Sequence, residues 1–207
     1  SPLHMKNEPM DPRDTFAGMG RTYQEKVMQA MMSDSLFADQ MLDVLKPAMF
    51  DVDYLQEIAT SFFEHKRKYK TFPSADVLEI MVTKDQELDK EIALQVREYL
   101  ARTKEHPLNG DTGYIQSSSL DFCKKQTMKA AIIKSIDMMD QMKFDDISQV
   151  IREALVAGSS RDLGHEYVCF CDRLGGRRMD PAALEQRNAL IDESADLLGI
   201  KILKGGE

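Results

Sequence analysis

The side chains that could most readily react or bind a metal ion are those of His165, Cys169 and Cys171. They lie close together near the C-terminal end of the sequence. An imidazole and two thiolates could in principle bind a thiophilic metal ion. A closed zinc site needs four ligands, and its cysteines are usually separated by two to four residues, whereas a single residue separates this pair. Ordinary packing is therefore the preferred interpretation, and we expect neither a metal nor another cofactor.

Other catalytic motifs are missing from the sequence. No G-x-x-x-x-G-K followed by Ser or Thr occurs, and the glycine pair at 175–176 lacks the lysine and hydroxyl that a phosphate-binding loop requires. Cys123 lies on the apolar stripe of a predicted helix, where a thiol behaves as a small hydrophobic side chain. We expect that this chain by itself is not an enzyme. Metal analysis would test the remaining interpretation, an enzyme built on the His165 cluster.

Composition narrows the class of protein. The chain has 207 residues, of which 43% are hydrophobic, and this is enough for one helical domain with appendages. Three cysteines do not form a disulfide framework, and neither a signal peptide nor a membrane span is predicted, so a cytoplasmic location fits best. A net charge of −8 disfavours direct nucleic-acid binding, which depends on several Lys or Arg contacts to phosphates. Residues 1–4 are interpreted as a cloning remnant before Met5.

The apolar pattern predicts helices throughout, and the fold is expected to be all-α. Residues 1–20 are predicted to be a disordered lead, and residues 21–112 a compact helical domain. Five helix starts are expected in this domain, at a capping box beginning with Thr22 and at the N-cap residues Ser35, Asp53, Ser74 and Asp89. Pro47 is expected to stop the second of these helices.

The second half is predicted to be more extended. A helix from Tyr114 to Met142 would measure roughly 40 Å, more than a small domain can cover, so part of it should pack on something else. A short helix from Phe144 is closed by Gly158, a residue type that suits a left-handed end. Residues 113–158 are therefore a predicted hairpin arm and linker helix. Residues 159–207 are predicted to be a linker followed by a C-terminal helix from Asp180 to Gly199.

Several short segments resemble one known family. They are GYIQSSSLDFCKKQTMKAAIIKSID at 113–137, the helix at 147–158 and DLGHEY at 162–167. In this order and spacing they resemble the linker of DnaB-type replicative helicases, particularly phage forms. The helices from Thr22 to Lys104, including Phe-Pro-Ser at 72–74, are similar to the N-terminal domain of the same family. The resemblance covers residues 21–167, and the family's ATPase domain is absent.

This resemblance implies a non-catalytic module for oligomerisation and protein docking. N-terminal domains of the family pair through helical hairpins into a ring collar, and a linker helix docks on a neighbouring subunit. The partners implied are the chain itself and a helicase, primase or loader. The residues implied in self-association are Phe122, Ala130, Ile133, Ile136 and Met139. The residues implied in docking are Ile147, Val150, Ile151, Ala154 and Leu155.

Two other interpretations stay open. A small DNA-binding regulatory protein would use the basic run His65–Lys70 together with Arg173, Arg177 and Arg178. A solvated helix end, whose positive side chains lie next to the negative end of the helix dipole, is the preferred explanation of the run at 65–70. Alternatively, both apolar faces of the second half could pack within a monomeric helical bundle of unknown purpose.

Overall fold

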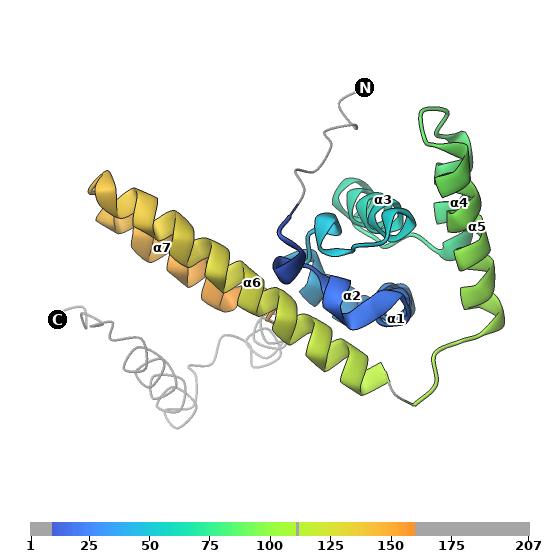
Figure 1. The fold of residues 1–207 in the computed structure, drawn as a ribbon, viewed down its shortest axis with the longest axis horizontal. Helices are drawn as coiled ribbons and strands as arrows, with labels where there is room; N and C mark the ends of the chain where they lie inside the picture. The colour runs from blue at the N-terminus through green and yellow to red at the C-terminus, as the bar shows by residue number, and fades with distance from the viewer. Residues whose placement is uncertain (1–9, 111, 160–207) are drawn as a thin grey trace, which may run out of the picture. The chain divides into compact units, whose positions relative to one another are not determined.

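The computed structural model describes residues 10–110 and 112–159. All regular structure in this part of the chain is helical (Figure 1), which confirms the predicted all-α fold. The α-helices are α1 (Gly20–Ser33), α2 (Ser35–Leu42), α3 (Asp53–Tyr69), α4 (Ala75–Lys84), α5 (Lys90–Glu105), α6 (Thr112–Asp140) and α7 (Phe144–Val156). Short 3-10 helices are η2 (Pro12–Asp14), η3 (Phe16–Met19) and η4 (Pro47–Met49).

Residues 1–160 form one compact unit, and residues 161–207 are assigned to a second. The second unit lies outside the described residues, and with it lie several sequence-based predictions. These are the cluster of His165, Cys169 and Cys171, the motif at 162–167, the arginines at 173, 177 and 178, and the helix expected at 180–199.

Side-chain hydrogen bonds to free backbone amides cap three of the first five α-helices. Ser74 and Asp89 cap α4 and α5 as predicted, the first by accepting the Val77 amide at 3.3 Å and the second by accepting the Glu91 amide at 2.7 Å. Ser35 is not the cap of α2. The carboxylate of Asp34 caps this helix instead, by accepting hydrogen bonds from the backbone amides of Leu36 at 3.0 Å and Phe37 at 3.2 Å. The first and third helices begin without any side-chain cap.

The N-terminal lead is ordered from Met10 onward, which corrects the predicted disorder of residues 10–20. The side chain of Asp11 caps η2, and Thr15 caps η3 by accepting the Ala17 amide at 3.2 Å. Between these turns Phe16 is fully buried, with its ring centroid 4.9 Å from that of Phe122. The proline and glycine content suggested a flexible segment, whereas one buried aromatic side chain anchors it.

The core lies between α1, α3 and α5 and the first half of α6. On α3 the buried apolar side chains recur at helical spacing and form one stripe, which comprises Leu55, Ile58, Ala59, Phe62 and Phe63. Pro47 does not itself end α2, which stops at Leu42, and it opens η4 instead. No helix among the described residues is both long and apolar enough to cross a membrane.

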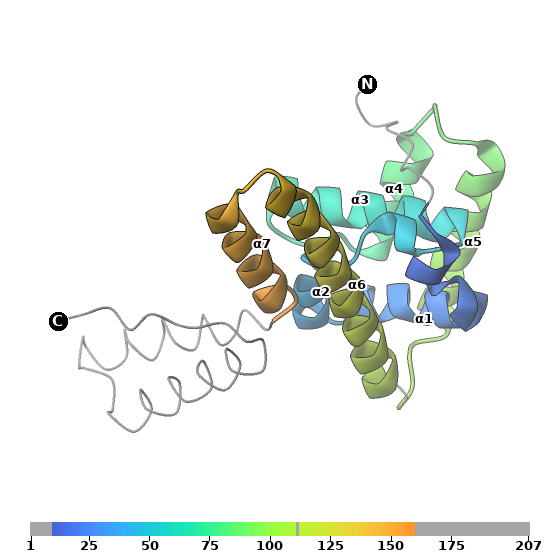
Figure 2. The ribbon, with the colours of Figure 1, turned by 60° about the vertical axis from the view of Figure 1, so that its left-hand side comes forward.

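Helices α6 and α7 form an antiparallel hairpin that leaves this core. Figure 1 shows α6 crossing the helical body with its first half and then projecting beyond it, and both ribbon views show α7 returning alongside α6 (Figures 1 and 2). The contact between α6 and α7 is the most extensive one between any two elements of the described part. We call residues 131–156 of this hairpin the arm.

Candidate association surface on the helical arm

The first half of α6 belongs to the core. Ile115, Ser119 and Cys123 follow one another at a spacing of four residues, and all three are buried. Ser119 satisfies its hydroxyl by donating to the Ile115 carbonyl oxygen at 2.6 Å. Cys123 lies with its sulfur 3.8 Å from the sulfur of Met49, and burial raises the pKa of its thiol. A thiol held neutral in this way is a packing residue and a poor nucleophile.

The second half of α6 exposes its apolar residues. Ile132, Ile136 and Met139 share one face at spacings of four and three residues, and they are 50%, 53% and 55% exposed. A body of this size buries most large aliphatic side chains, so a row of three exposed ones on a single helix face is a distinct feature.

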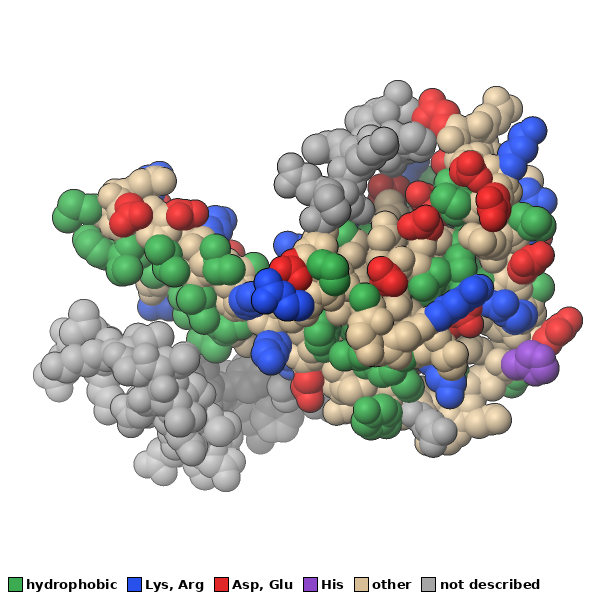
Figure 3. All heavy atoms as spheres, viewed as in Figure 1, with side chains coloured by type: hydrophobic (Ala, Val, Ile, Leu, Met, Phe, Trp, Pro, Cys, Tyr) green, Lys and Arg blue, Asp and Glu red, His purple; other side chains and the backbone are tan. Residues whose placement is uncertain are grey.

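Helix α7 extends this apolar surface. Its Phe144 and Leu155, 59% and 43% exposed, lie eleven residues apart, a spacing that puts both on one face of the helix. In the space-filling view, hydrophobic side chains gather along the arm (Figure 3). We call Ile132, Ile136, Met139, Phe144 and Leu155 the arm face.

The residues implied in docking lie mostly against α6. Ala154 is buried, as is Ala131 on the facing helix, and small side chains at both positions let the two helices approach closely. Ile147, Val150 and Ile151 are half-buried, and only Leu155 is exposed. As placed here, this face helps to hold the hairpin together. A docking role for it stays a prediction.

The residues implied in self-association divide into two groups. Phe122 is half-buried and packs on the core through Phe16, and its role in self-association stays a prediction. Ile133, Ile136 and Met139 are exposed on the arm, and Ala130 is exposed directly before it. Ile132, Met142, Phe144, Leu155 and Val156 are further exposed hydrophobic side chains of the hairpin. The sequence prediction did not include Ile132 and Phe144 in either group, although their apolar character next to the long stripe could have indicated them.

A glycine fastens the returning end of the hairpin to the body. Gly158 has φ +73°, and a Cβ atom on it would lie 3.0 Å from Val44 Cγ1 and 3.3 Å from Leu120 Cδ1. Its carbonyl oxygen accepts a hydrogen bond from the Gln40 side chain at 3.3 Å. The prediction of a left-handed glycine at the end of this helix is therefore confirmed.

The turn at the tip of the arm has an unusual residue. Met142 adopts φ +56° and is 73% exposed. The Met142 amide donates to the Met139 carbonyl at 3.0 Å, and the Lys143 amide donates to the Met138 carbonyl at 3.0 Å. This pair of bonds is the Schellman ending of a helix, and its left-handed position is one that glycine usually occupies.

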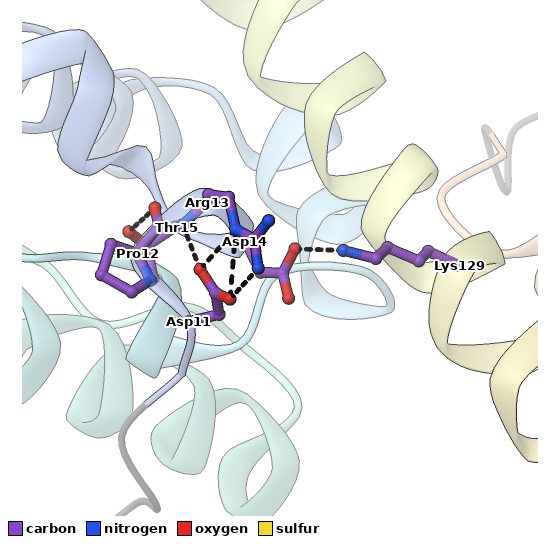
Figure 4. Close-up of polar contacts among 6 residues, drawn as sticks. All are labelled: Asp11, Pro12, Arg13, Asp14, Thr15 and Lys129. Carbon is purple, nitrogen blue, oxygen red and sulfur yellow. Dashed lines mark hydrogen bonds and ion pairs between the residues drawn. The ribbon is translucent and has the colours of Figure 1, made fainter.

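The N-terminal turn braces the base of the arm. Asp11 holds Arg13 within the turn, and the carboxylate of Asp14 lies 2.6 Å from the Lys129 ammonium on α6 (Figure 4). Beside this ion pair is a pocket of about 100 Å³. Its lining includes the apolar side chains of Met10, Met49, Ala130 and Ile133 together with the cations of Lys46 and Lys129.

A polar cluster centred on Glu25 joins α1, α3 and α5. The Glu25 carboxylate accepts hydrogen bonds from the Tyr54 hydroxyl and from Arg102 at 2.6 Å, and Arg21 donates to the Tyr54 hydroxyl at 2.8 Å. The buried Tyr99 hydroxyl donates to the Glu25 carbonyl oxygen at 2.5 Å. Burial, followed by the charge of Glu25, raises the pKa of Tyr99 well above its ordinary value. Every polar group here has a protein partner, so the cluster stabilises the packing of the three helices.

The basic run at the end of α3 is partly used within the fold. Lys66 lies 3.4 Å from the carboxylate of Asp39 and donates to the Lys70 carbonyl oxygen at 3.0 Å. Lys70 in turn donates to the Arg67 carbonyl oxygen at 2.8 Å. These bonds satisfy the free carbonyls of a helix end, as positive side chains at that position often do.

Among residues 10–110 and 112–159, no three His, Cys, Asp or Glu side chains are grouped so that they could hold a metal ion. No protein-family model, curated protein or solved structure that we compared with this chain matches it.

Proposed function

We propose that this chain is a non-catalytic module for self-association and protein docking, of the kind that assembles the N-terminal collar of a replicative helicase. The observation that carries the proposal is the arm face, five large apolar side chains that are each at least 43% exposed. Exposed apolar residues that are contiguous on a projecting hairpin favour a protein partner, because their burial removes apolar surface from water.

A second copy of the chain is the partner that best fits this surface. The arm is a two-helix hairpin, and two such hairpins pack as a four-helix bundle that buries the apolar sides of both. Helicase, primase or loader proteins are the further partners that we propose, since the resemblance at 113–167 implies them.

The test of the proposal is the solution mass over a range of protein concentrations, measured by light scattering. We expect a dimer or larger ring for the natural sequence. Replacing Ile136 with Asp should weaken the assembly by roughly a hundredfold, because a carboxylate would be buried without a partner in the interface.

A matched control comes from α4. Ile80 has the same exposed fraction as Ile136, 53%, but lies on the body away from the arm. Ile80→Asp should therefore leave the mass unchanged. A natural chain that is monomeric at all concentrations, or equal effects of the two substitutions, would refute the proposal.

A DNA-binding regulatory role is the second candidate. It is favoured by Arg67 and Lys68, which have no carboxylate partner among the described residues and lie next to the 58% exposed Tyr69. A salt-dependent shift of labelled DNA that disappears in Arg67→Glu/Lys68→Glu protein would support this role. No shift at physiological ionic strength would remove it.

A further inference from the structure

We infer that two copies of the chain pair through the arm face with their arms pointing in opposite directions, so that the tip of each arm lies beside the base of the other. This inference rests on the proposed self-association and deepens it, because it names which residues of the two copies meet. A parallel pair, with both tips at one end, would bury the same arm face. The distribution of charge along the arm distinguishes the two arrangements.

The arm face lies on one side of the hairpin, where a single partner can cover it. Ala131 of α6 and Ala154 of α7 are the buried residues of the arm, and they mark where the two helices face each other. Following the chain direction, the α6 part of the arm face lies roughly a quarter turn from Ala131, and Phe144 and Leu155 lie roughly a quarter turn from Ala154. Because α6 and α7 run in opposite directions, both quarter turns lead to the same side.

The position of a two-fold axis follows from the spacing of the apolar residues on α6. When two copies of a helix pack antiparallel about such an axis, residues that are equally far from it on either side contact each other. Ile132 and Met139 flank Ile136 at nearly equal distances along α6. An axis near Ile136 therefore places Ile132 of each copy against Met139 of the other and buries all three side chains.

Helix α7 leads independently to the same level. Its exposed apolar residues Phe144 and Leu155 have their midpoint between positions 149 and 150. The turn residue Met142 lies midway between Ile136 and Ser148 in the chain, so the hairpin brings Ser148 level with Ile136. The two helices thus place the axis at one level to within about two residues, or roughly 3 Å.

On the outer edge of α7, an acid and a base repeat this symmetry. Asp145 and Arg152 are seven residues apart, so they lie on one side of the helix about two turns from each other. Their midpoint is next to Ser148. Both are exposed, and neither has an ion pair among residues 10–110 and 112–159. In the antiparallel pair, Asp145 of each copy therefore lies beside Arg152 of the other.

On the outer edge of α6, Asp140 and Lys129 form the corresponding pair. Their midpoint lies between positions 134 and 135, again close to the proposed axis. Lys129 already binds Asp14 of its own chain, so this contact contributes less than the one on α7. Lys143 at the tip comes to the level of the same ion pair in the other copy, where Asp14 supplies a negative charge.

The parallel arrangement brings like charges together. It sets α6 of one copy against α7 of the other at equal distances from the tip. Asp140 then lies beside Asp145, and Lys129 lies beside Arg152. Like charges that face each other across an interface oppose its formation, and flanking charges of this kind set the orientation of paired helices.

The whole side of the hairpin that bears the arm face shows the same division of charge. The tip is net negative, with Asp140, Lys143 and Asp145. The base is net positive, with Asp14, Asp121, Lys124, Lys125, Lys129 and Arg152. Lys125 and Lys129 are exposed, so the body does not cover the surface that the tip of a second copy would reach. Opposed arms match the two net charges, whereas parallel arms set each against its own sign.

Cross-linking with single cysteines distinguishes the two arrangements. In full-length protein with Cys169 and Cys171 changed to Ser, Ser148→Cys should form a disulfide between two copies under mild oxidation, because Ser148 is exposed and lies at the axis. Met142→Cys should form none, because opposed arms separate the two tips by roughly 20 Å. A disulfide at Met142→Cys with none at Ser148→Cys would overturn the inference in favour of parallel arms.

A matched control is the adjacent position. Gln149 is also exposed, but it lies about 100° further around α7, on the side away from the arm face. Gln149→Cys should therefore give no disulfide between copies. Equal cross-linking at positions 148 and 149 would mean that the disulfides form by random collision, and this too would overturn the inference.

Charge reversal gives opposite signs for the two arrangements. For opposed arms, Asp145→Arg should weaken association about fivefold, because two equivalent ion pairs are lost, and Arg152→Asp should do the same. The double exchange should recover most of the loss. For parallel arms, Asp145→Arg would strengthen association by removing the repulsion from Asp140. The control is Asp146→Arg, in the same first turn of α7 but on the side away from the arm face, and it should have little effect.

The outcomes separate this inference from the proposed function. If the chain is dimeric but its association is unchanged or strengthened by Asp145→Arg, the opposed pairing fails while the proposed self-association stands. If light scattering shows a monomer at all concentrations, both fail.

Discussion

At the scale of single residues, Tyr99 shows how a buried polar group can be satisfied and still make the fold sensitive to pH. Its hydroxyl donates to a backbone carbonyl of α1, and its ring lies 5.8 Å from that of Tyr54. The pKa of Tyr99 is raised, chiefly by burial and then by the charge of Glu25. Ionisation of this phenol is therefore disfavoured in the folded chain.

We expect stability to fall as the pH rises above the ordinary tyrosine pKa of 10.0, because only the unfolded chain readily loses this proton there. At neutral pH, Tyr99→Phe should lower the free energy of unfolding by about 1 kcal/mol, because it removes the hydrogen bond that the hydroxyl donates to the Glu25 carbonyl oxygen. The variant should lose less stability than the natural chain between neutral and alkaline pH. Urea unfolding at both pH values measures the difference. Equal alkaline losses in the two proteins would contradict the assignment.

At the scale of elements, the left-handed backbone of Gly158 allows the chain to turn away directly after α7. The residue combines a left-handed backbone with a close approach to Val44, Lys124 and Leu120, so a side chain there is strained in two ways. This fixes the returning end of the hairpin to both α6 and the segment after α2, and it gives the arm a stable base.

Gly158→Ala should destabilise the chain by about 1 to 3 kcal/mol, since alanine disfavours this φ and its Cβ atom would lie within 3.0 Å of Val44 Cγ1. The comparison is Gly113→Ala in α6, where nothing lies within 4 Å of the added atom. That change should be neutral or stabilising by up to about 1 kcal/mol, because alanine favours a helix. Urea unfolding and amide hydrogen exchange in α7 would reveal the contrast, and similar effects of the two changes would contradict it.

At the scale of the whole described unit, the body and the arm contribute differently to stability. The core cluster extends from Phe16 to Cys123, with Ala157 packed against it, and takes no residue from the central part of the arm. The body should therefore fold without the projecting part of the hairpin.

Replacing residues 133–148 with a short glycine-rich turn should leave a cooperative unfolding transition close to that of the natural chain. The same variant should be monomeric, because it lacks Ile136, Met139 and Phe144. Circular dichroism during thermal unfolding and light scattering on the same samples measure both properties. A shortened chain that fails to fold would show that the arm is part of the core, whereas one that still assembles would place the interface elsewhere.

The sequence by itself determined the helical class and most helix positions, because these depend on local properties. Ser74 and Asp89 cap α4 and α5 as their positions in the sequence predicted, and Gly158 could be predicted from the left-handed geometry that ends a helix. Such signals are contained in a few neighbouring residues.

Only the tertiary structure decided which apolar faces are buried. Phe122 and Ile136 belong to the same predicted stripe, yet the first packs against Phe16 and the second is 53% exposed, because the body ends partway along α6. The sequence likewise gave no sign that Phe16 anchors the lead, or that Met10 and Lys46 line a pocket with Ala130. These relations join residues far apart in the chain, and local periodicity carries no information about such distances.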